Sequence, residues 1–291
     1  MAVSFEELKE KHPCFAQGAK SNNGRIHLPV SPGCNIACHF CKRDFNETEN
    51  RPGVASGIIT PEEAIGVIKR AVEAMPQIHV VGVAGPGDTL ATPYALETFR
   101  KVKEVYPDLI KCMSTNGLML YEKADEVIEA GIDSLTVTVN AVDPRIQAKI
   151  NEFIIWHGKK YEGEEAAEIL IENQLKGIEK VAKGGVTVKV NTVLIPEINR
   201  DHVKTVAKTV AEKGATMYNI IPLIPQHHLA HCTEPDCNLL YEVRAEAEQY
   251  IKVFRHCQRC RADAIGIPGG KDISKQIYLR EVKLENTFSH G

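Results

Sequence analysis

The sequence has neither the strong net charge that is typical of nucleic-acid-binding proteins nor the long apolar run of a membrane-spanning helix. Among its 291 residues, Lys and Arg number 35 and Asp and Glu 38, for a formal net charge of −3. Such a balance does not favour binding to nucleic acid or to an anionic membrane. No run of about 18 apolar residues is present, so we expect no membrane-spanning helix. The N-terminus, MAVSFEELKEKHPCF, is charged and has no apolar centre, unlike a secretory signal peptide.

Cysteine, by contrast, is plentiful. Nine cysteines without a secretory signal favour metal or redox chemistry in a reducing cytoplasm over a disulfide framework. Three of them, Cys34, Cys38 and Cys41, lie in SPGCNIACHFCKRD with a C-x3-C-x2-C spacing. Four such thiols would close a zinc or iron–sulfur site, whereas three leave one position free for another molecule. A zinc loop completed by a distant ligand is the alternative.

The remainder of the chain alternates between apolar, β-rich segments and amphipathic segments. The clearest helix follows Thr60, a predicted N-cap, with Pro61 at the first helical position and Glu63 completing a capping box. Six βα units in a row predict a parallel sheet, because parallel strands need crossover helices. The predicted strands are 25–31, 78–85, 110–115, 134–140, 186–194 and 217–224, and the later helices are 93–105, 120–130, 164–183, 201–213 and 239–254.

We therefore expect one α/β domain over residues 25–254, with extensions at 1–24 and 255–291. Catalytic groups of βα barrels lie at the carboxyl ends of the strands. The cysteine triplet directly follows the first predicted strand and should lie at that face. Alternation within this strand places Arg25 and His27 opposite Ile26, Leu28 and Val30.

Small and polar residues follow the other predicted strands. Glycines in GVAGPGDTL allow a ligand to approach the backbone closely. Asn and Thr side chains at successive strand ends suit ribose hydroxyls and a carboxylate, although each alone is more typical of a turn. The candidates for binding a cofactor are Gly85, Gly87, Asp88, Ser114, Thr115, Asn116, Asn140, Asn191 and Thr192.

The cysteine spacing after a first strand resembles that of the radical S-adenosylmethionine (SAM) superfamily. The resemblance implies a partial (β/α)6 TIM-like barrel with a [4Fe–4S] cluster on Cys34, Cys38 and Cys41. The open iron would chelate the amino and carboxylate groups of SAM. One electron then cleaves SAM to methionine and a 5′-deoxyadenosyl radical. The segment Gly85–Asp88 matches the glycine-rich motif at the methionyl amino group.

A longer, ordered set of motifs resembles the NifB family, radical SAM enzymes of nitrogenase cofactor assembly. The motifs are HPCF, RIHLPVSPGCN, CKRDFNETENRPG, AGPGD, STNG and RHCQRCRADAIG. The resemblance implies two further [4Fe–4S] clusters that serve as substrates. Cys14, His27 and Cys112 would hold one of them, and the C-x2-C pair Cys257 and Cys260 the other. The two extensions would then close over the barrel mouth and bring the clusters together.

The same resemblance implies the reaction. The enzyme fuses its two substrate clusters around a SAM-derived carbide, with an extra sulfur, to an 8Fe–9S–C precursor. One SAM donates a methyl group to a cluster sulfide, and the radical from a second SAM abstracts hydrogen from it. Glu49, with Asp44 and Arg51, is the candidate for handling protons. Asn46 stands where some family members have a cysteine, so the third ligand of the second cluster stays open, with Cys232 and Cys237 as candidates.

The partners implied are iron–sulfur cluster donor proteins, an electron donor and a downstream carrier or scaffold of nitrogenase assembly, in an anaerobic or low-oxygen cytoplasm. Some bacterial relatives carry a C-terminal cofactor-binding domain, whose role a partner would take here. Two alternatives are a radical SAM enzyme that modifies a peptide or small molecule, and a carrier of clusters that is no enzyme. The first predicts a permanent, fully ligated auxiliary cluster. The second leaves Gly85–Asp88 without a role.

Overall fold

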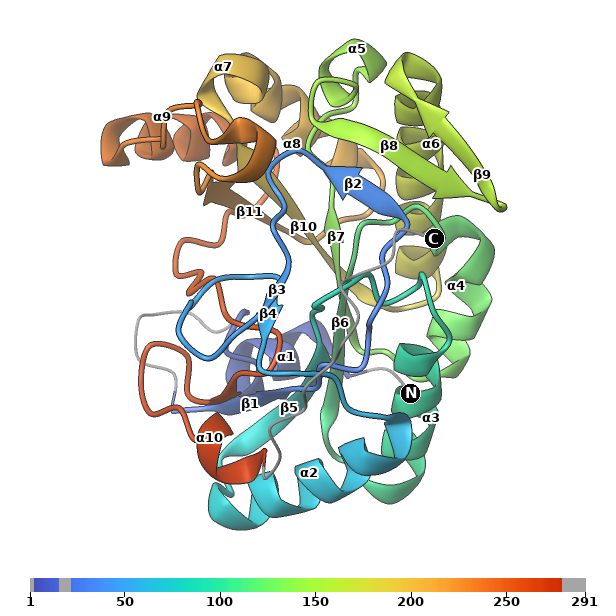
Figure 1. The fold of residues 1–291 in the computed structure, drawn as a ribbon, viewed down its shortest axis with the longest axis vertical. Helices are drawn as coiled ribbons and strands as arrows, with labels where there is room; N and C mark the ends of the chain where they lie inside the picture. Colours follow the sequence, from blue (N-terminus) through green and yellow to red (C-terminus); the bar gives the residue numbers. More distant parts are fainter. Residues whose placement is uncertain (1–2, 16–21, 279–291) are drawn as a thin grey trace.

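A curled seven-stranded sheet organises the computed structural model, which describes residues 3–15 and 22–278 (Figure 1). Six strands are parallel, in the spatial order β11-β10-β7-β6-β5-β1. They are β1 (Gly24–His27), β5 (Ile78–Val83), β6 (Ile110–Thr115), β7 (Ser134–Thr138), β10 (Thr187–Leu194) and β11 (Met217–Pro222). The predicted partial (β/α)6 barrel is thus confirmed. The seventh strand, β12 (Ile265–Gly266), pairs antiparallel with β1 at the sheet edge.

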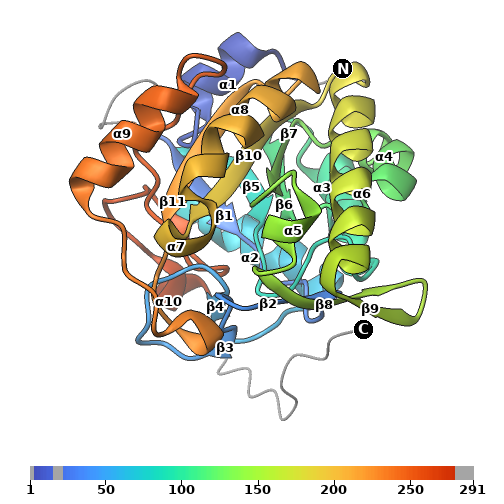
Figure 2. The same cartoon turned by 90° about the horizontal axis from the view of Figure 1, so that it is seen from above.

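Six helices, each of which follows one of the parallel strands along the chain, cover the outer face of this sheet (Figure 2). They are α2 (Pro61–Ala74), α3 (Tyr94–Val105), α4 (Leu120–Glu129), α6 (Gly163–Lys183), α8 (Val203–Glu212) and α9 (Cys237–Ala247). The capping box that starts α2 is present, since the Thr60 hydroxyl accepts from the Glu63 amide and the Glu63 carboxylate accepts from the Thr60 amide. The main core lies between sheet and helices, and Ile26, Leu28 and Val30 are fully buried in it.

The last predicted helix is too long at its C-terminus. It was expected over 239–254, but α9 ends at Ala247. The following residues are extended and bond to β11: the Tyr218 amide donates to Lys252 and the Phe254 amide donates to Tyr218. These backbone bonds use donors and acceptors that a longer helix would have kept, so tertiary pairing overrides the helical pattern.

A hairpin over residues 151–162 was not predicted. Its strands β8 (Asn151–Trp156) and β9 (Lys159–Glu162) join through His157 and Gly158, both with positive φ, as two-residue hairpin turns require. β8 pairs with β2 (Ile36–Cys38), so the hairpin braces the loop that carries the cysteine triplet.

The remaining elements are short and were also not predicted. They are α1 (Phe5–Lys11), β3 (Asp44–Phe45), β4 (Val54–Ala55), α5 (Pro144–Gln147), α7 (Pro196–Asn199), the 3-10 turns η1 (Arg200–His202) and η2 (His227–Leu229), and α10 (Ser274–Ile277).

Described residues of both terminal segments pack against the inside of the sheet. Leu8 from α1 and Phe15 share one apolar cluster with Phe254 and with Val80 and Ile110 of the sheet. β12 then ties the C-terminal segment to β1. The part of the predicted C-terminal extension after residue 278 lies outside the described residues.

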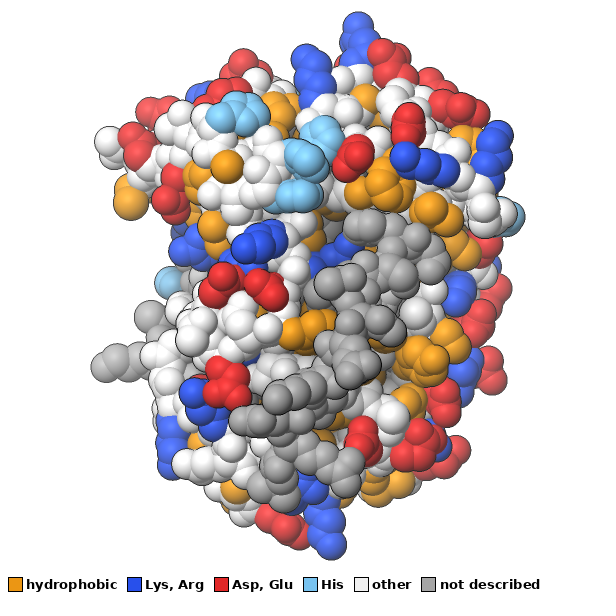
Figure 3. All heavy atoms as spheres, viewed as in Figure 1, with side chains coloured by type: hydrophobic (Ala, Val, Ile, Leu, Met, Phe, Trp, Pro, Cys, Tyr) orange, Lys and Arg blue, Asp and Glu red, His pale blue; other side chains and the backbone are white. Residues whose placement is uncertain are grey.

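The surface carries mixed charge on the face shown in Figure 3, where Lys and Arg side chains are interspersed with Asp and Glu. Within residues 3–15 and 22–278, none of the helices has the length and apolarity needed to cross a bilayer.

Two helical glycines should respond in opposite ways to substitution by alanine. A Cβ at Gly177 in α6 would lie 2.6 Å from Leu120 Cγ and 2.9 Å from the Tyr121 amide nitrogen of α4. We expect Gly177→Ala to lower the free energy of unfolding by about 1–3 kcal/mol, because the two helices must separate. In α2, a Cβ at Gly66 would meet only the end of Arg70 at 3.5 Å.

Gly66→Ala is therefore the control, and it should raise stability by up to about 1 kcal/mol through helix propensity alone. Urea unfolding of the cluster-free protein measures both. If both variants changed the free energy of unfolding equally, the α4–α6 contact would not be as close as described.

Candidate functional site

A cavity of about 360 Å³ opens on the inner side of the sheet. Its wall includes residues from β1, β5, β6, β7, β10 and β11, and from both terminal segments. All eight residues predicted to hold iron line this one cavity: Cys14, His27, Cys34, Cys38, Cys41, Cys112, Cys257 and Cys260. Residues from opposite ends of the chain thus meet in one chamber.

The cysteine triplet is held by backbone contacts with the segment after β5. The Gly87 amide donates to the Ser31 carbonyl and the Asp88 amide to the Gly33 carbonyl, both at 2.8 Å. A Cβ at Gly87 would lie 1.9 Å from the Gly33 oxygen, so only glycine permits this approach. Cys41 closes a turn by donating its amide to the Cys38 carbonyl at 3.0 Å.

The triplet fits a [4Fe–4S] cluster as a donor set. The three thiols are free and partly buried, and burial raises the pKa of Cys34 to about 12 and that of Cys38 well above its usual value. Burial thus disfavours the thiolate form in the empty site, and bound iron would favour it. Among the described residues, no three His, Cys, Asp or Glu side chains converge as ligands of one metal ion would. The ligands of a [4Fe–4S] cluster lie farther apart than those of a single metal ion, because each thiolate binds a different iron.

Asp88 organises the end of the neighbouring strand β6. Its buried carboxylate accepts from the Asn116 amide at 2.6 Å, from the Leu90 amide at 2.9 Å and from the Thr115 hydroxyl at 3.0 and 3.1 Å. The Asn116 side chain in turn donates to Asn35 at 2.8 Å, beside Cys34. Burial raises the pKa of Asp88 against the effect of these bonds. The carboxylate is thus a structural centre that joins the glycine-rich segment, β6 and the cysteine loop.

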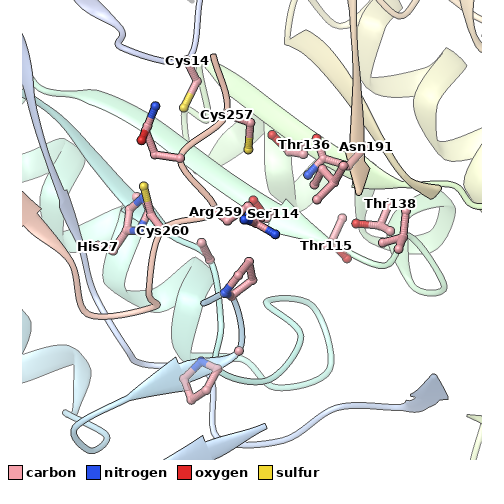
Figure 4. A pocket seen from close by; sticks show the side chains of 18 of the residues that line it. Cys14, His27, Ser114, Thr115, Thr136, Thr138, Asn191, Cys257, Arg259 and Cys260 are labelled. Carbon is pink, nitrogen blue, oxygen red and sulfur yellow. The ribbon is translucent and has the colours of Figure 1, made fainter. Parts of the chain in front are cut away.

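Polar side chains line the cavity beyond the triplet. Of the residues predicted to bind a cofactor, those that line it are Gly87, Asp88, Ser114, Thr115, Asn116 and Asn191. Thr136 and Thr138 of β7 line it as well and were not predicted. Their alternation in SLTVTVN was the available signal, since every second residue of a strand shares a face. Figure 4 shows Thr136, Thr138 and Asn191 grouped on one side of the cavity.

Three other predicted residues do not reach the cavity wall. Thr192 points away from Asn191, donating its hydroxyl to the Val139 carbonyl and accepting from the Tyr218 hydroxyl. Asn140 is buried, and its side-chain oxygen accepts from the Val193 amide at 2.9 Å. Gly85 lies behind the lining, against Ala262. Their predicted role in cofactor binding therefore stays a prediction that no contact with the cavity supports.

His27 is poised as a neutral ligand. Its Nδ1 donates to the Arg261 carbonyl at 2.9 Å, which leaves the Nε2 lone pair free. Burial and the nearby Arg25 guanidinium lower the pKa of His27 to about 4, so the ring is neutral at pH 7. Burial also raises the pKa of Cys14 to about 11 and raises that of Cys112. The chemistry of this set suits iron, since imidazole and thiolate both bind it.

Cys257 and Cys260 approach the same chamber from the C-terminal segment (Figure 4). Arg25 Nη2 donates to Cys260 Sγ at 3.2 Å and Arg25 Nη1 to the Gly266 carbonyl at 2.8 Å. Arg261 anchors the segment by donating to the Asn46 and Glu49 carbonyls at 2.7 and 2.5 Å. The pair is therefore held by contacts with β1 and with the loop after the triplet.

The predicted proton-handling residues lie outside the cavity wall. Glu49 forms an ion pair with Arg51 at 2.5 Å, and Arg51 also donates to the Lys42 carbonyl. Asp44 accepts from the Phe45 amide in β3. Their side chains tie the loop after the triplet together. Cys232 is buried and Cys237 exposed, both away from the cavity, so the structure does not bring either to Cys257 and Cys260.

Comparison with known proteins identifies the family. Residues 28–210 match the model of the radical SAM superfamily. The FeMo cofactor biosynthesis protein NifB of Methanocaldococcus infernus is 44% identical over 284 residues, covering 97% of this chain and 94% of that one. That of Klebsiella pneumoniae is 41% identical, covering 91% of this chain and 58% of its own.

A solved structure shows the same fold at low identity. The crystal structure of Streptococcus suis SuiB covers 80% of this chain and 49% of its own at 10% identity, with a TM-score of 0.56. The cysteine triplet, the glycine-rich segment and the similarity over nearly the whole length agree. The chain belongs to the NifB family of radical SAM proteins.

Proposed function

We propose that this protein acts in FeMo cofactor biosynthesis as a radical SAM carbide synthase. It joins two [4Fe–4S] substrate clusters around a SAM-derived carbon, with one additional sulfur, to form an 8Fe–9S–C product. One observation carries the proposal: the cysteine triplet and both further ligand sets line the same cavity. A carrier would not need the triplet with its vacant position, and an enzyme acting on an organic molecule would not need two incomplete ligand sets.

Different residues of the chain would hold the SAM-binding cluster and SAM itself. Cys34, Cys38 and Cys41 would hold the cluster that binds SAM. When bound, that cluster and SAM supply a methyl group and the 5′-deoxyadenosyl radical. The backbone at Gly87 approaches the cysteine loop closely, and the polar groups of Thr136, Thr138 and Asn191 suit ribose and carboxylate.

The substrate sets contain few ligands, which suits clusters that must leave. A structural cluster is held by four protein ligands. The first substrate cluster would have three, Cys14, His27 and Cys112. The second would have two, Cys257 and Cys260. Imidazole is a weaker donor to iron than thiolate, so His27 would ease release of the product. Glu49 is engaged by Arg51 outside the cavity wall, so we do not assign it the proton transfers.

Three partners follow from this reaction. A cluster donor supplies the substrates, an electron donor drives SAM cleavage, and a carrier or scaffold accepts the product.

Iron content and EPR before and after SAM test the proposal. Anaerobic reconstitution should give about twelve irons per chain, four for each of three clusters, with one signal that shifts on SAM. SAM labelled in its methyl carbon should then transfer label to a cluster extracted from the protein. About four irons, all responding to SAM, would contradict the proposal and leave a radical SAM protein without substrate clusters.

His27→Cys should retain the first substrate cluster but slow its conversion. Thiolate binds iron more firmly than imidazole, so release of the product should fall by about tenfold or more, for a difference of about 1.4 kcal/mol. Iron content after gel filtration measures retention of the cluster, and the rate at which labelled product leaves the protein measures its release. His27→Ala is the control and should lose about four irons. Unchanged product release in His27→Cys would disprove the role of the weak ligand.

Asp88→Asn should weaken SAM binding while leaving the substrate sets filled. An amide cannot accept from Leu90, Thr115 and Asn116 as a carboxylate does, and bonds to a charged acceptor contribute about 1.5–3 kcal/mol each. We expect SAM affinity to fall by about 10- to 100-fold by equilibrium binding. Asp143→Asn at the N-cap of α5 is the control, since Asn caps equally well. Equal affinities in the two variants would contradict the role of Asp88.

A further inference from the structure

Lys189 in β10 is a buried cation without a carboxylate partner. Its exposed fraction is 6%, and among residues 3–15 and 22–278 no hydrogen bond or ion pair reaches its ammonium. Its Nζ lies 5.6 Å from the Phe15 ring centroid and 5.7 Å from that of Phe254. Such cation–π contacts offset only part of the cost of burying an ammonium that has no anionic partner.

Lys111 in β6 shows how the same sheet satisfies a buried lysine. It is 5% exposed, and its Nζ donates to the Leu109 carbonyl at 2.8 Å and lies 3.5 Å from Asp133. Lys111 faces away from the cavity, whereas Lys189 lines it. The difference indicates that Lys189 receives its anionic partner from a molecule that enters the cavity.

The surroundings of Lys189 indicate which anion this is. Its charge interacts with four thiols, those of Cys14, Cys112, Cys257 and Cys260. These are the two sets proposed to hold the substrate clusters. An iron–sulfur cluster bound by thiolates carries net negative charge and exposes sulfides that accept hydrogen bonds. The cation therefore lies where such a cluster would bring negative charge.

His12 supplies a second unpartnered donor. The ring is 2% exposed, and its Nδ1 accepts from the Cys14 amide at 3.0 Å. A neutral ring that accepts at Nδ1 carries its proton on Nε2, and this buried Nε2 has no partner in the described part of the chain. His12 lines the cavity. His27 has the opposite arrangement, with Nδ1 donating and Nε2 free to bind iron.

We propose that Lys189 and His12 bind the sulfides of the first substrate cluster as hydrogen-bond donors, without being ligands to iron. The inference rests on the proposed function, in which Cys14, His27 and Cys112 hold that cluster. Two donors to sulfide explain how a cluster with three protein ligands, one of them neutral, is retained until it reacts. They also leave the iron–ligand bonds free to exchange.

Lys189→Met separates this role from a structural one. Removing an unpaired buried charge should raise the melting temperature of the cluster-free protein by about 2–4 °C. In the reconstituted protein without SAM, loss of the charged donor should speed release of about four irons to a chelator by about tenfold. The reduction potential of the retained cluster should become more negative. Lys189→Arg keeps the charge and should restore slow release.

Two further variants serve as controls. Lys111→Met removes an equally buried lysine but takes away the cation beside the buried Asp133 carboxylate, so it should lower the melting temperature and leave iron release from folded protein unchanged. His12→Phe keeps a ring beside Phe15 but removes the Nε2 donor. It should speed iron release like Lys189→Met, with the melting temperature unchanged or lower.

The outcomes distinguish this inference from the proposed function. If the wild-type protein takes up about four irons, the substrate clusters are absent and the proposed function fails. If the wild type takes up about twelve irons and Lys189→Met releases them at the wild-type rate and potential, the function stands and the role of Lys189 is refuted. A lower melting temperature of cluster-free Lys189→Met would also contradict an unpaired charge.

Discussion

The close approach of the segment after β5 to the loop after β1 is the contact on which the site depends. Two backbone bonds at 2.8 Å join Gly87 to Ser31 and Asp88 to Gly33, and no side chain fits between them. From this contact the Asp88 carboxylate extends the network to the end of β6. One glycine and one buried carboxylate thus place the cysteine loop, the polar strand ends and the cavity wall relative to one another.

The barrel is incomplete, and described residues of both terminal segments pack against its sheet. Phe15 and Phe254 pack together against the inside of the sheet, and β12 extends its edge beside β1. These apolar contacts carry Cys14 inward from one end and Cys257 from the other. Because the first proposed ligand set combines Cys14 with residues of β1 and β6, and the second comes from the C-terminal segment, the geometry of the chamber depends on the whole fold.

Charge inside the chamber is arranged for an anionic occupant. Burial raises the pKa of the Cys14 and Cys112 thiols, and Arg25 and Lys189 are buried at the cavity wall without a carboxylate partner in the described chain. Cations buried in this way destabilise the empty protein. A cluster that brings iron to the thiols and negative charge to the cations would satisfy both, and cluster loading would then stabilise the fold.

The sequence by itself determined the six βα units, because strand and helix periodicities are local, and the cysteine spacing with the motif order determined the family. It also identified eight iron-ligand candidates that line one cavity. Only the tertiary structure decided which strand-end residues face that cavity, since Asn191 and Thr192 are neighbours that point to opposite sides. The pairing of β8 with the cysteine loop, the early end of α9 and the surroundings of Lys189 depend on contacts between segments far apart in the chain, which no local pattern encodes.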